Sequence, residues 1–204
     1  MLTIHHLRIG RSIFTVWLLE ELGLEYELIE YLRDPETMRA PPELRDVHPL
    51  GKSPVIEDDG LLLSESGAIT AYLLRKYDSD GRFTPDPDDL TAWTEYTQWL
   101  HYAEGSVFPP LLLKLLSLRS GGNPLLDGFA DPEVELHFNH IATQLGDKPF
   151  ILGEDISGAD FGITYMVSMA ERLGLLAPWP TLAAYAERNM ARPAFQRAVE
   201  RAVE

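Results

Sequence analysis

Strand-like and helix-like patterns alternate over residues 1–31, and this alternation constrains the fold more than any other feature. Leu2–His6 and Tyr26–Tyr31 have the composition of short β-strands. Between them, Ser12 begins a stretch whose apolar side chains recur at helical spacing, and Gly23 suits a helix C-terminus. A strand, a helix and a strand in about thirty residues predict a βαβ unit, in which the two strands are parallel.

The α/β pattern continues as far as residue 79. Residues 33–48, with Pro49 directly after them, are rich in proline and predict a loop that could include a short helix near Pro42–Arg45. Residues 54–57 and 61–64 predict two antiparallel strands joined by an Asp-Asp-Gly turn, and a helix follows to about Tyr77. The predicted order is therefore β-α-β-loop-β-β-α.

Strand-like patterns stop at that point, and the remaining sequence is helical. Residues 80–88 belong to an Asp-, Gly- and Pro-rich segment that predicts a linker. The first expected helical region covers 90–119, with a break at Pro109-Pro110, and a loop follows at 120–128. Asp131 is the expected N-cap of the next helix, and Ser157 with Asp160 forms a capping box at the start of a helix over 157–173. Two further helices are expected at 181–189 and 193–204. We therefore predict an α/β domain at 1–79, a linker at 80–88 and an all-α domain at 89–204.

The composition excludes several classes of function. The chain contains no cysteine, which rules out disulfides, thiolate metal sites, iron–sulfur clusters and a protein thiol nucleophile. Its formal net charge of −15 argues against nucleic acid or an anionic membrane as a partner. No secretory leader and no apolar stretch of membrane-spanning length is evident, so we expect a cytoplasmic protein.

Two predicted helix starts have the chemistry to bind anions. Ser12, with Arg11 beside it, begins the first helix, where unpaired backbone N–H groups and a partial positive charge favour a thiolate. Alternatively, Ser12 caps that helix. Glu65-Ser66-Gly67 begins a later helix and suits an α-amino-acid head group, with Ser66 at the carboxylate and Glu65 at the ammonium. A helix cap with an acid in the first turn fits this spacing equally well.

The segment His48–Pro54 places a proline at the start of a strand, beside an irregular loop. Such a position favours a cis X-Pro bond. A cis Ser53–Pro54 bond would turn the Ser53 N–H and C=O outward, where an extended peptide could pair with them. Lys52 could reach a carboxylate; the alternative is a proline-stiffened loop with Lys52 in solvent.

Polar and aromatic side chains precede the proline break. These side chains are His101, Tyr102, Ser106 and Phe108. They could line a cleft facing the α/β domain, or they could simply pack between the domains. His137 and His140 have a spacing that could hold a metal, but no carboxylate or cysteine motif supports them. We therefore expect these two histidines on an exposed helix face and no metal in the protein.

Together these segments resemble the soluble glutathione S-transferases, and most of all their bacterial and fungal, Gtt-like branch. The matching segments occur in the family order over nearly the whole chain: WLLEELGL (17–24), RDP (33–35), APPELR (40–45), HPLGKSPVI (48–56), SESGAI (64–69), WLHYAEGS (99–106) and SGADF (157–161). The resemblance implies an N-terminal thioredoxin-like domain, a C-terminal helical domain that contributes the electrophile pocket, and a homodimer.

The resemblance also implies roles for individual residues. Pro54 would be the cis-proline, and Ser53 would pair through its backbone with the cysteinyl part of glutathione. Glu65 and Ser66 would hold the γ-glutamyl end, and Lys52 would approach the glycine carboxylate. Glutathione is the implied cosubstrate.

The sequence departs from the family pattern at the residues expected beside the glutathione thiol. The branch usually has Ser-Arg-Ser-x-Arg before the tryptophan, whereas this chain has Gly10-Arg11-Ser12-Ile13-Phe14. Gly10 and Ile9 offer no hydroxyl, so Ser12 is the remaining candidate, with Arg11 as electrostatic help.

We therefore expect a glutathione transferase that conjugates the glutathione thiolate to an apolar electrophile. The alternatives are a glutathione-dependent peroxidase, isomerase or reductive dehalogenase, a non-catalytic ligand-binding protein, and an interaction scaffold with the same fold. Because the chain and its cosubstrate are both anionic, the site needs local positive charge. We expect that charge from Arg8, Arg11, Lys52 and two helix N-termini.

Overall fold

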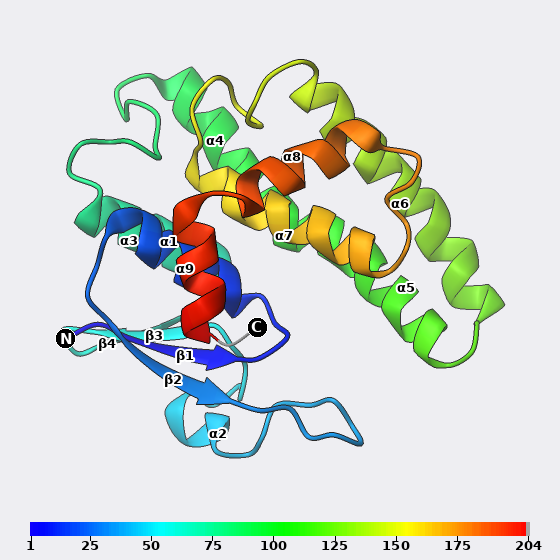
Figure 1. Cartoon of the computed structure of the whole chain (residues 1–204), viewed down its shortest axis with the longest axis horizontal. Helices are drawn as coiled ribbons and strands as arrows, with labels where there is room; N and C mark the ends of the chain where they lie inside the picture. Colours follow the sequence, from blue (N-terminus) through cyan, green and yellow to red (C-terminus); the bar gives the residue numbers. More distant parts are fainter. Residues whose placement is uncertain (203–204) are drawn as a thin grey trace. The chain divides into compact units, whose positions relative to one another are not determined.

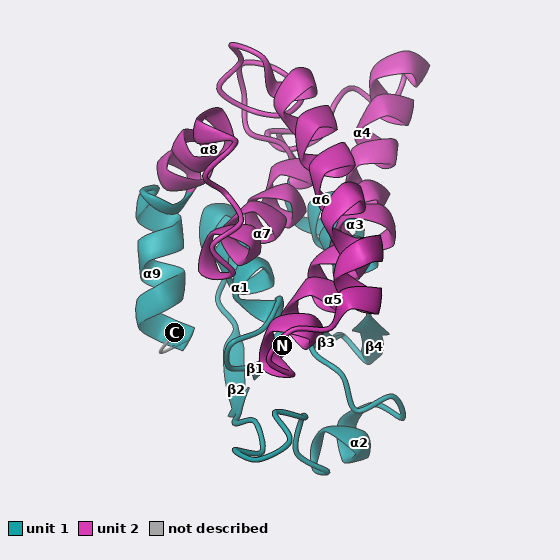
Figure 2. Ribbon diagram, turned by 90° about the vertical axis from the view of Figure 1, so that its right-hand side faces the viewer, with its two compact units in different colours: residues 1–79, 190–204 teal, residues 80–189 magenta. Residues whose placement is uncertain are grey.

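The computed structural model describes residues 1–202, and the chain divides into two compact units. Unit 1 comprises Met1–Ser79 and the segment that begins at Met190, and unit 2 comprises Asp80–Asn189 (Figure 2). The last helix, expected in the all-α domain, groups with the sheet because it packs on the first helix. The boundaries at 79, 80–88 and 89 stay a prediction from the sequence.

Unit 1 contains, within the described residues, a mixed sheet with the strand order β2-β1-β3-β4. β1 (Thr3–Leu7) and β2 (Glu27–Tyr31) pair in parallel, as the βαβ pattern predicts. β3 (Val55–Asp58) runs antiparallel to β1 and to β4 (Leu61–Ser64). The expected thioredoxin-like α/β architecture is confirmed.

Helices cover both sides of this sheet. α1 (Ser12–Leu22) and α3 (Ser66–Tyr77) lie on one side, and the short α2 (Leu44–Val47) lies on the other (Figure 1). Every residue of α1 from Ser12 to Leu19 is buried, which explains why its apolar side chains are spread around the whole helix.

α9 (Pro193–Ala202) packs against α1 (Figure 1). The ring of Phe195 meets the buried Trp17 edge to face, with 5.5 Å between the ring centres. Arg197 donates to Glu20 across 2.9 Å, and Arg192 donates to Glu21 across 3.0 Å. The end of the expected helix at 203–204 lies outside the described residues.

Unit 2 is helical, and its helices are α4 (Leu90–Tyr102), α5 (Phe108–Arg119), α6 (Pro124–Leu145), α7 (Gly158–Arg172) and α8 (Pro180–Met190). The expected break at Pro109-Pro110 is wrong. Both prolines lie in the first turn of α5, where the missing N–H of proline costs little. The interruption comes earlier, in a π-helical turn at Ala103–Val107.

The start of α6 also differs from the prediction. The helix is capped by Asn123, whose side chain accepts from the N–H groups of Leu125 and Leu126, and Pro124 occupies its first turn. The expected loop at 120–128 therefore ends early, and Asp131 is not an N-cap. Pro132 lies inside the helix, where the rest of a long α6 absorbs the loss of one hydrogen bond.

The predicted capping box at the start of α7 is confirmed. Asp160 is fully buried and accepts from the Ser157 N–H at 2.8 Å, while its other oxygen accepts from the Ile151 N–H and the Tyr185 hydroxyl. Asp160 is thus a structural residue of unit 2. None of the helices at residues 1–202 is long and apolar enough to cross a membrane.

Candidate functional site

Three segments with expected roles converge on one edge of the sheet in unit 1. Leu7, the last residue of β1, is opposite Tyr31, the last residue of β2. Val55, the first residue of β3, is opposite both His5 of β1 and Ser64, the last residue of β4. The loop before α1, the loop before β3 and the start of α3 therefore all leave the sheet at the same edge.

Ser12 is the first residue of α1, and its side chain turns back into the unit. It is fully buried, and its hydroxyl lies 2.9 Å from His6 Nδ1 and 3.3 Å from the Leu7 carbonyl oxygen. The N-cap position belongs to Arg11, so the capping interpretation of Ser12 is wrong. Contact between the Ser12 hydroxyl and a ligand sulfur remains a prediction.

The Ser53–Pro54 peptide bond is cis, as expected. The Ser53 hydroxyl donates to the His5 carbonyl at 2.8 Å, which ties this loop to β1. Within residues 1–202, no protein group bonds to the Ser53 backbone N–H or C=O. Lys52 beside it is exposed. The backbone of Ser53 is thus in a position to pair with an extended ligand.

The backbone N–H of Leu7 contacts both Ser12 and Ser53, the two serines with predicted roles at the site. The Leu7 N–H lies 3.2 Å from the Ser12 hydroxyl oxygen and 3.1 Å from the Ser53 hydroxyl oxygen. The loop before α1 and the loop before β3 are therefore fixed relative to each other through the end of β1.

The start of α3 carries an unusual backbone conformation. Glu65 occupies the N-cap position with a φ of 74°, in the left-handed region that a non-glycine residue adopts only when its surroundings impose it. Its side chain is exposed and does not cap the helix, and Ser66 follows as the half-buried first helical residue. Both polar groups therefore lie where α3 begins, at the same sheet edge as Ser53.

The loop before α1 shows a second departure, which the sequence patterns did not reveal. Ile9 has a φ of 56° and is 57% exposed. The Arg33 guanidinium donates to the carbonyl oxygens of Arg8 at 3.2 Å and of Ile9 at 2.9 Å. A side chain at Gly10 would come within 2.7 Å of the Leu7 carbonyl oxygen. This loop has no room for the serine that the related branch usually places there.

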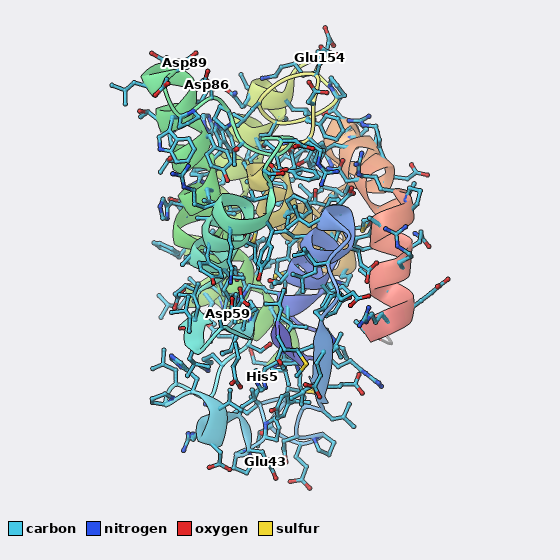
Figure 3. The ribbon with its side chains drawn as sticks, turned by 90° about the vertical axis from the view of Figure 1, so that its left-hand side faces the viewer. His5, Glu43, Asp59, Asp86, Asp89 and Glu154 are labelled. Carbon is cyan, nitrogen blue, oxygen red and sulfur yellow. The ribbon has the colours of Figure 1, made fainter. Side chains whose placement is uncertain are left out.

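The charges near this edge differ from the expectation at one residue. Arg8 forms an ion pair with Glu30 across 2.7 Å, so its charge is largely balanced within unit 1. His5 is buried on the side of the sheet that faces the segment with Glu43 (Figure 3). It bridges Glu57 at 2.9 Å and the Tyr31 hydroxyl at 3.0 Å. The exposed Lys52 is a candidate for local positive charge, and a contribution from Arg11 stays a prediction.

The expected electrophile-pocket residues lie at the junction of α4, the π-helical turn and α5 in unit 2. Their exposure differs: His101 is exposed, whereas Tyr102, Ser106 and Phe108 are half-buried. The Tyr102 hydroxyl is 2.6 Å from His137 Nδ1 on α6, and burial raises the pKa of Tyr102 to about 12. Tyr102 thus engages α6.

Of the two histidines of α6, His140 is exposed, as the sequence predicts, whereas His137 is half-buried. Burial lowers the pKa of the half-buried His137, and the His140 ring stacks on Trp99 with 5.4 Å between the ring centres. His137 is half-buried because Tyr102 of α4 packs against it, a contact that only the fold brings together. Residues 1–202 contain no group of three or more side chains placed to hold a metal ion.

The comparisons with known proteins agree with this layout. Residues 2–75 match the family model for the N-terminal domain of glutathione S-transferases. Glutathione S-transferase 3 of Schizosaccharomyces pombe is 32% identical over 187 residues, covering 84% of this chain and 75% of the relative.

Solved structures extend the similarity to the whole chain. A glutathione S-transferase from Actinobacillus pleuropneumoniae is 37% identical, with a TM-score of 0.90, and covers 99% of this chain and 93% of its own. A glutathione transferase homologue from Lodderomyces elongisporus, solved with two glutathione molecules per subunit, shares the fold at 20% identity and a TM-score of 0.85, covering 98% of this chain and 97% of its own.

Proposed function

Because the chain belongs to the glutathione S-transferase family, we propose that it conjugates the thiolate of glutathione to an apolar electrophile. The observation that carries the proposal is the meeting of three features at one sheet edge. They are the N-terminus of α1, the Ser53 backbone beside cis-Pro54, and the Glu65–Ser66 start of α3. Each feature suits a different part of glutathione.

The tripeptide binds along this edge in an extended form. Its cysteinyl part pairs with the Ser53 N–H and C=O as an added strand. Glu65 holds the ammonium of the γ-glutamyl end, and Ser66 with the α3 N-terminus holds the carboxylate of that end. Lys52, exposed next to Ser53, binds the glycine carboxylate.

The thiol then lies at the N-terminus of α1. Backbone N–H groups of the first turn and the Arg11 guanidinium stabilise the thiolate, and the thiol proton leaves to solvent. The thiolate attacks the electrophile and forms a carbon–sulfur bond while the leaving group departs. His101, Ser106 and Phe108 contribute to the electrophile pocket, with Tyr102 held in place by His137.

Calorimetric titration with reduced glutathione tests the binding site. Glu65→Gln removes the partner of the ammonium, and we expect the dissociation constant to rise about tenfold to a hundredfold, because a charge-assisted bond contributes about 1.5–3 kcal/mol. Glu25→Gln removes the same charge from an exposed position outside the site and should bind like the unaltered protein. Absence of binding by the unaltered protein would refute the proposal.

One observation favours a second candidate, a glutathione-binding protein without transferase activity. The Ser12 hydroxyl is buried and engaged by Leu7 and His6, and no hydroxyl is available at Ile9 or Gly10. Turnover of an aryl halide, measured beside reduction of an organic hydroperoxide, separates a conjugating enzyme, a peroxidase and a binder.

We propose a cytoplasmic homodimer that removes reactive electrophiles. Exposed apolar side chains on α6 support a second copy as partner, since Leu125, Phe129 and Leu136 are 82%, 58% and 59% exposed.

A further inference from the structure

The backbone before α1 is held in a conformation that its own sequence disfavours. Ile9 is β-branched, and such a residue with a φ of 56° is an outlier that needs external support. The conformation is placed at the proposed thiol site, within the turn between β1 and α1. The group that supports this conformation therefore affects the direction in which the first-turn N–H groups of α1 point.

Arg33 provides that support. Its Nε lies 3.2 Å from the carbonyl oxygens of both Arg8 and Ile9, and its Nη2 lies 2.9 Å from the Ile9 oxygen. Its Nη1 donates to the Met38 carbonyl at 3.0 Å. Met38 is itself left-handed, with a φ of 58°, so one guanidinium binds the carbonyls of two residues in disfavoured conformations.

The same guanidinium closes over Gly10. A Cβ atom at Gly10 would lie 3.3 Å from Arg33 Nη2, in addition to its clash with the Leu7 carbonyl oxygen. The absence of a side chain at position 10 and the presence of Arg33 are therefore two parts of one arrangement. In this arrangement the Arg33 guanidinium binds the loop carbonyls, whose partial negative charge would otherwise disfavour a nearby thiolate.

We propose that Arg33 is a positioning residue that lowers the thiol pKa of bound glutathione by clamping the Arg8 and Ile9 carbonyls. The inference rests on the proposed function, because it concerns the same thiol. The planar guanidinium is essential to it, since a lysine ammonium cannot span three carbonyl oxygens in this way.

The test follows the ionisation of bound glutathione by thiolate absorbance near 240 nm as a function of pH, with S-methylglutathione as the blank. Arg33→Ala should raise the thiol pKa by about one unit, which lowers the thiolate fraction at neutral pH by up to about tenfold. Arg33→Lys should behave like Arg33→Ala. Arg39→Ala, which removes an exposed arginine from the same segment, should leave the thiol pKa unchanged.

Binding of S-methylglutathione separates this inference from the proposed function. It should bind the unaltered protein and Arg33→Ala within about threefold, a difference of about 0.6 kcal/mol, because the subsites at both ends of the tripeptide remain. If glutathione binds and ionises but Arg33→Ala leaves the pKa unchanged, the role of Arg33 is refuted while the proposed function stands. Restoration of the pKa by Arg33→Lys would also refute it, because charge alone would then suffice.

A double variant keeps the inference falsifiable if Arg33→Ala folds poorly. Glycine adopts a positive φ without penalty, so Ile9→Gly should reduce the need for the clamp. We expect Arg33→Ala to shift the thiol pKa less in the Ile9→Gly background than in the unaltered chain. Equal shifts in the two backgrounds would show that Arg33 does not act through the Ile9 conformation.

Discussion

At the scale of single residues, the hydroxyls of Ser12 and Ser53 make structural bonds beside the proposed glutathione site. Both hydroxyls converge on the Leu7 N–H, and Ser12 also contacts His6 in the interior. Ser12→Ala should therefore lower the free energy of unfolding by about 1–3 kcal/mol, because buried polar partners lose a bond. We expect kcat/KM to fall less than about tenfold, by less than about 1.4 kcal/mol. Urea unfolding and steady-state kinetics measure the two effects.

Thr15→Val is the matched control, since it removes another buried hydroxyl from the same helix. A fall in kcat/KM of more than about a hundredfold in Ser12→Ala, without loss of stability, would show that the hydroxyl acts on the sulfur. The sequence singled out Ser12, Ser53 and Glu65, and the structure places all three at one edge of the sheet. It did not predict Arg33, because its carbonyl partners are set by backbone geometry that carries no side-chain signal.

At the scale of secondary-structure elements, Asp58 joins the β3–β4 turn to α3. It is buried and accepts from Lys76 at 2.7 Å, Tyr72 at 2.9 Å and Tyr77 at 2.7 Å. Burial by itself raises the pKa of Asp58, but these donors outweigh it and hold the pKa below its usual value. A depressed folded-state pKa contributes stability above the unfolded-state pKa of about 4, which is lost as the pH falls through the folded-state value.

Asp58→Asn should therefore cost about 2–3 kcal/mol of unfolding free energy at pH 7 and less at pH 3. Urea denaturation at both pH values measures the difference. Asp88→Asn, an exposed substitution in the predicted linker, serves as the control. An equal cost of Asp58→Asn at both pH values would contradict the linkage.

Elements were predicted well where a local pattern determined them. The βαβ unit, the β3–β4 hairpin and the capping box of α7 each depend on residues close in sequence. The start of α6 was missed because Asn123-Pro124 and Asp131-Pro132 both combine a good N-cap residue with a following proline. Packing of α6 along α5 selects the first pair, and sequence spacing does not contain that contact.

At the scale of the whole molecule, the exposed apolar residues of α6 make the proposed dimer testable. Phe129→Lys places a charge within this surface, and we expect sedimentation to show the mass of one chain where the unaltered protein shows twice that mass. Thr181→Lys adds the same charge at an exposed position of α8 and should remain dimeric. A dimer that persists in Phe129→Lys would place the interface elsewhere.

A crystal structure with glutathione bound would show whether the tripeptide lies along the sheet edge with its thiolate at α1. We predict that the cysteinyl backbone pairs with the Ser53 N–H and C=O, that the ammonium contacts Glu65, and that the sulfur is within hydrogen-bond distance of the first-turn N–H groups of α1. A sulfur atom directed away from α1, or glutathione bound away from Ser53 and Glu65, would contradict the account.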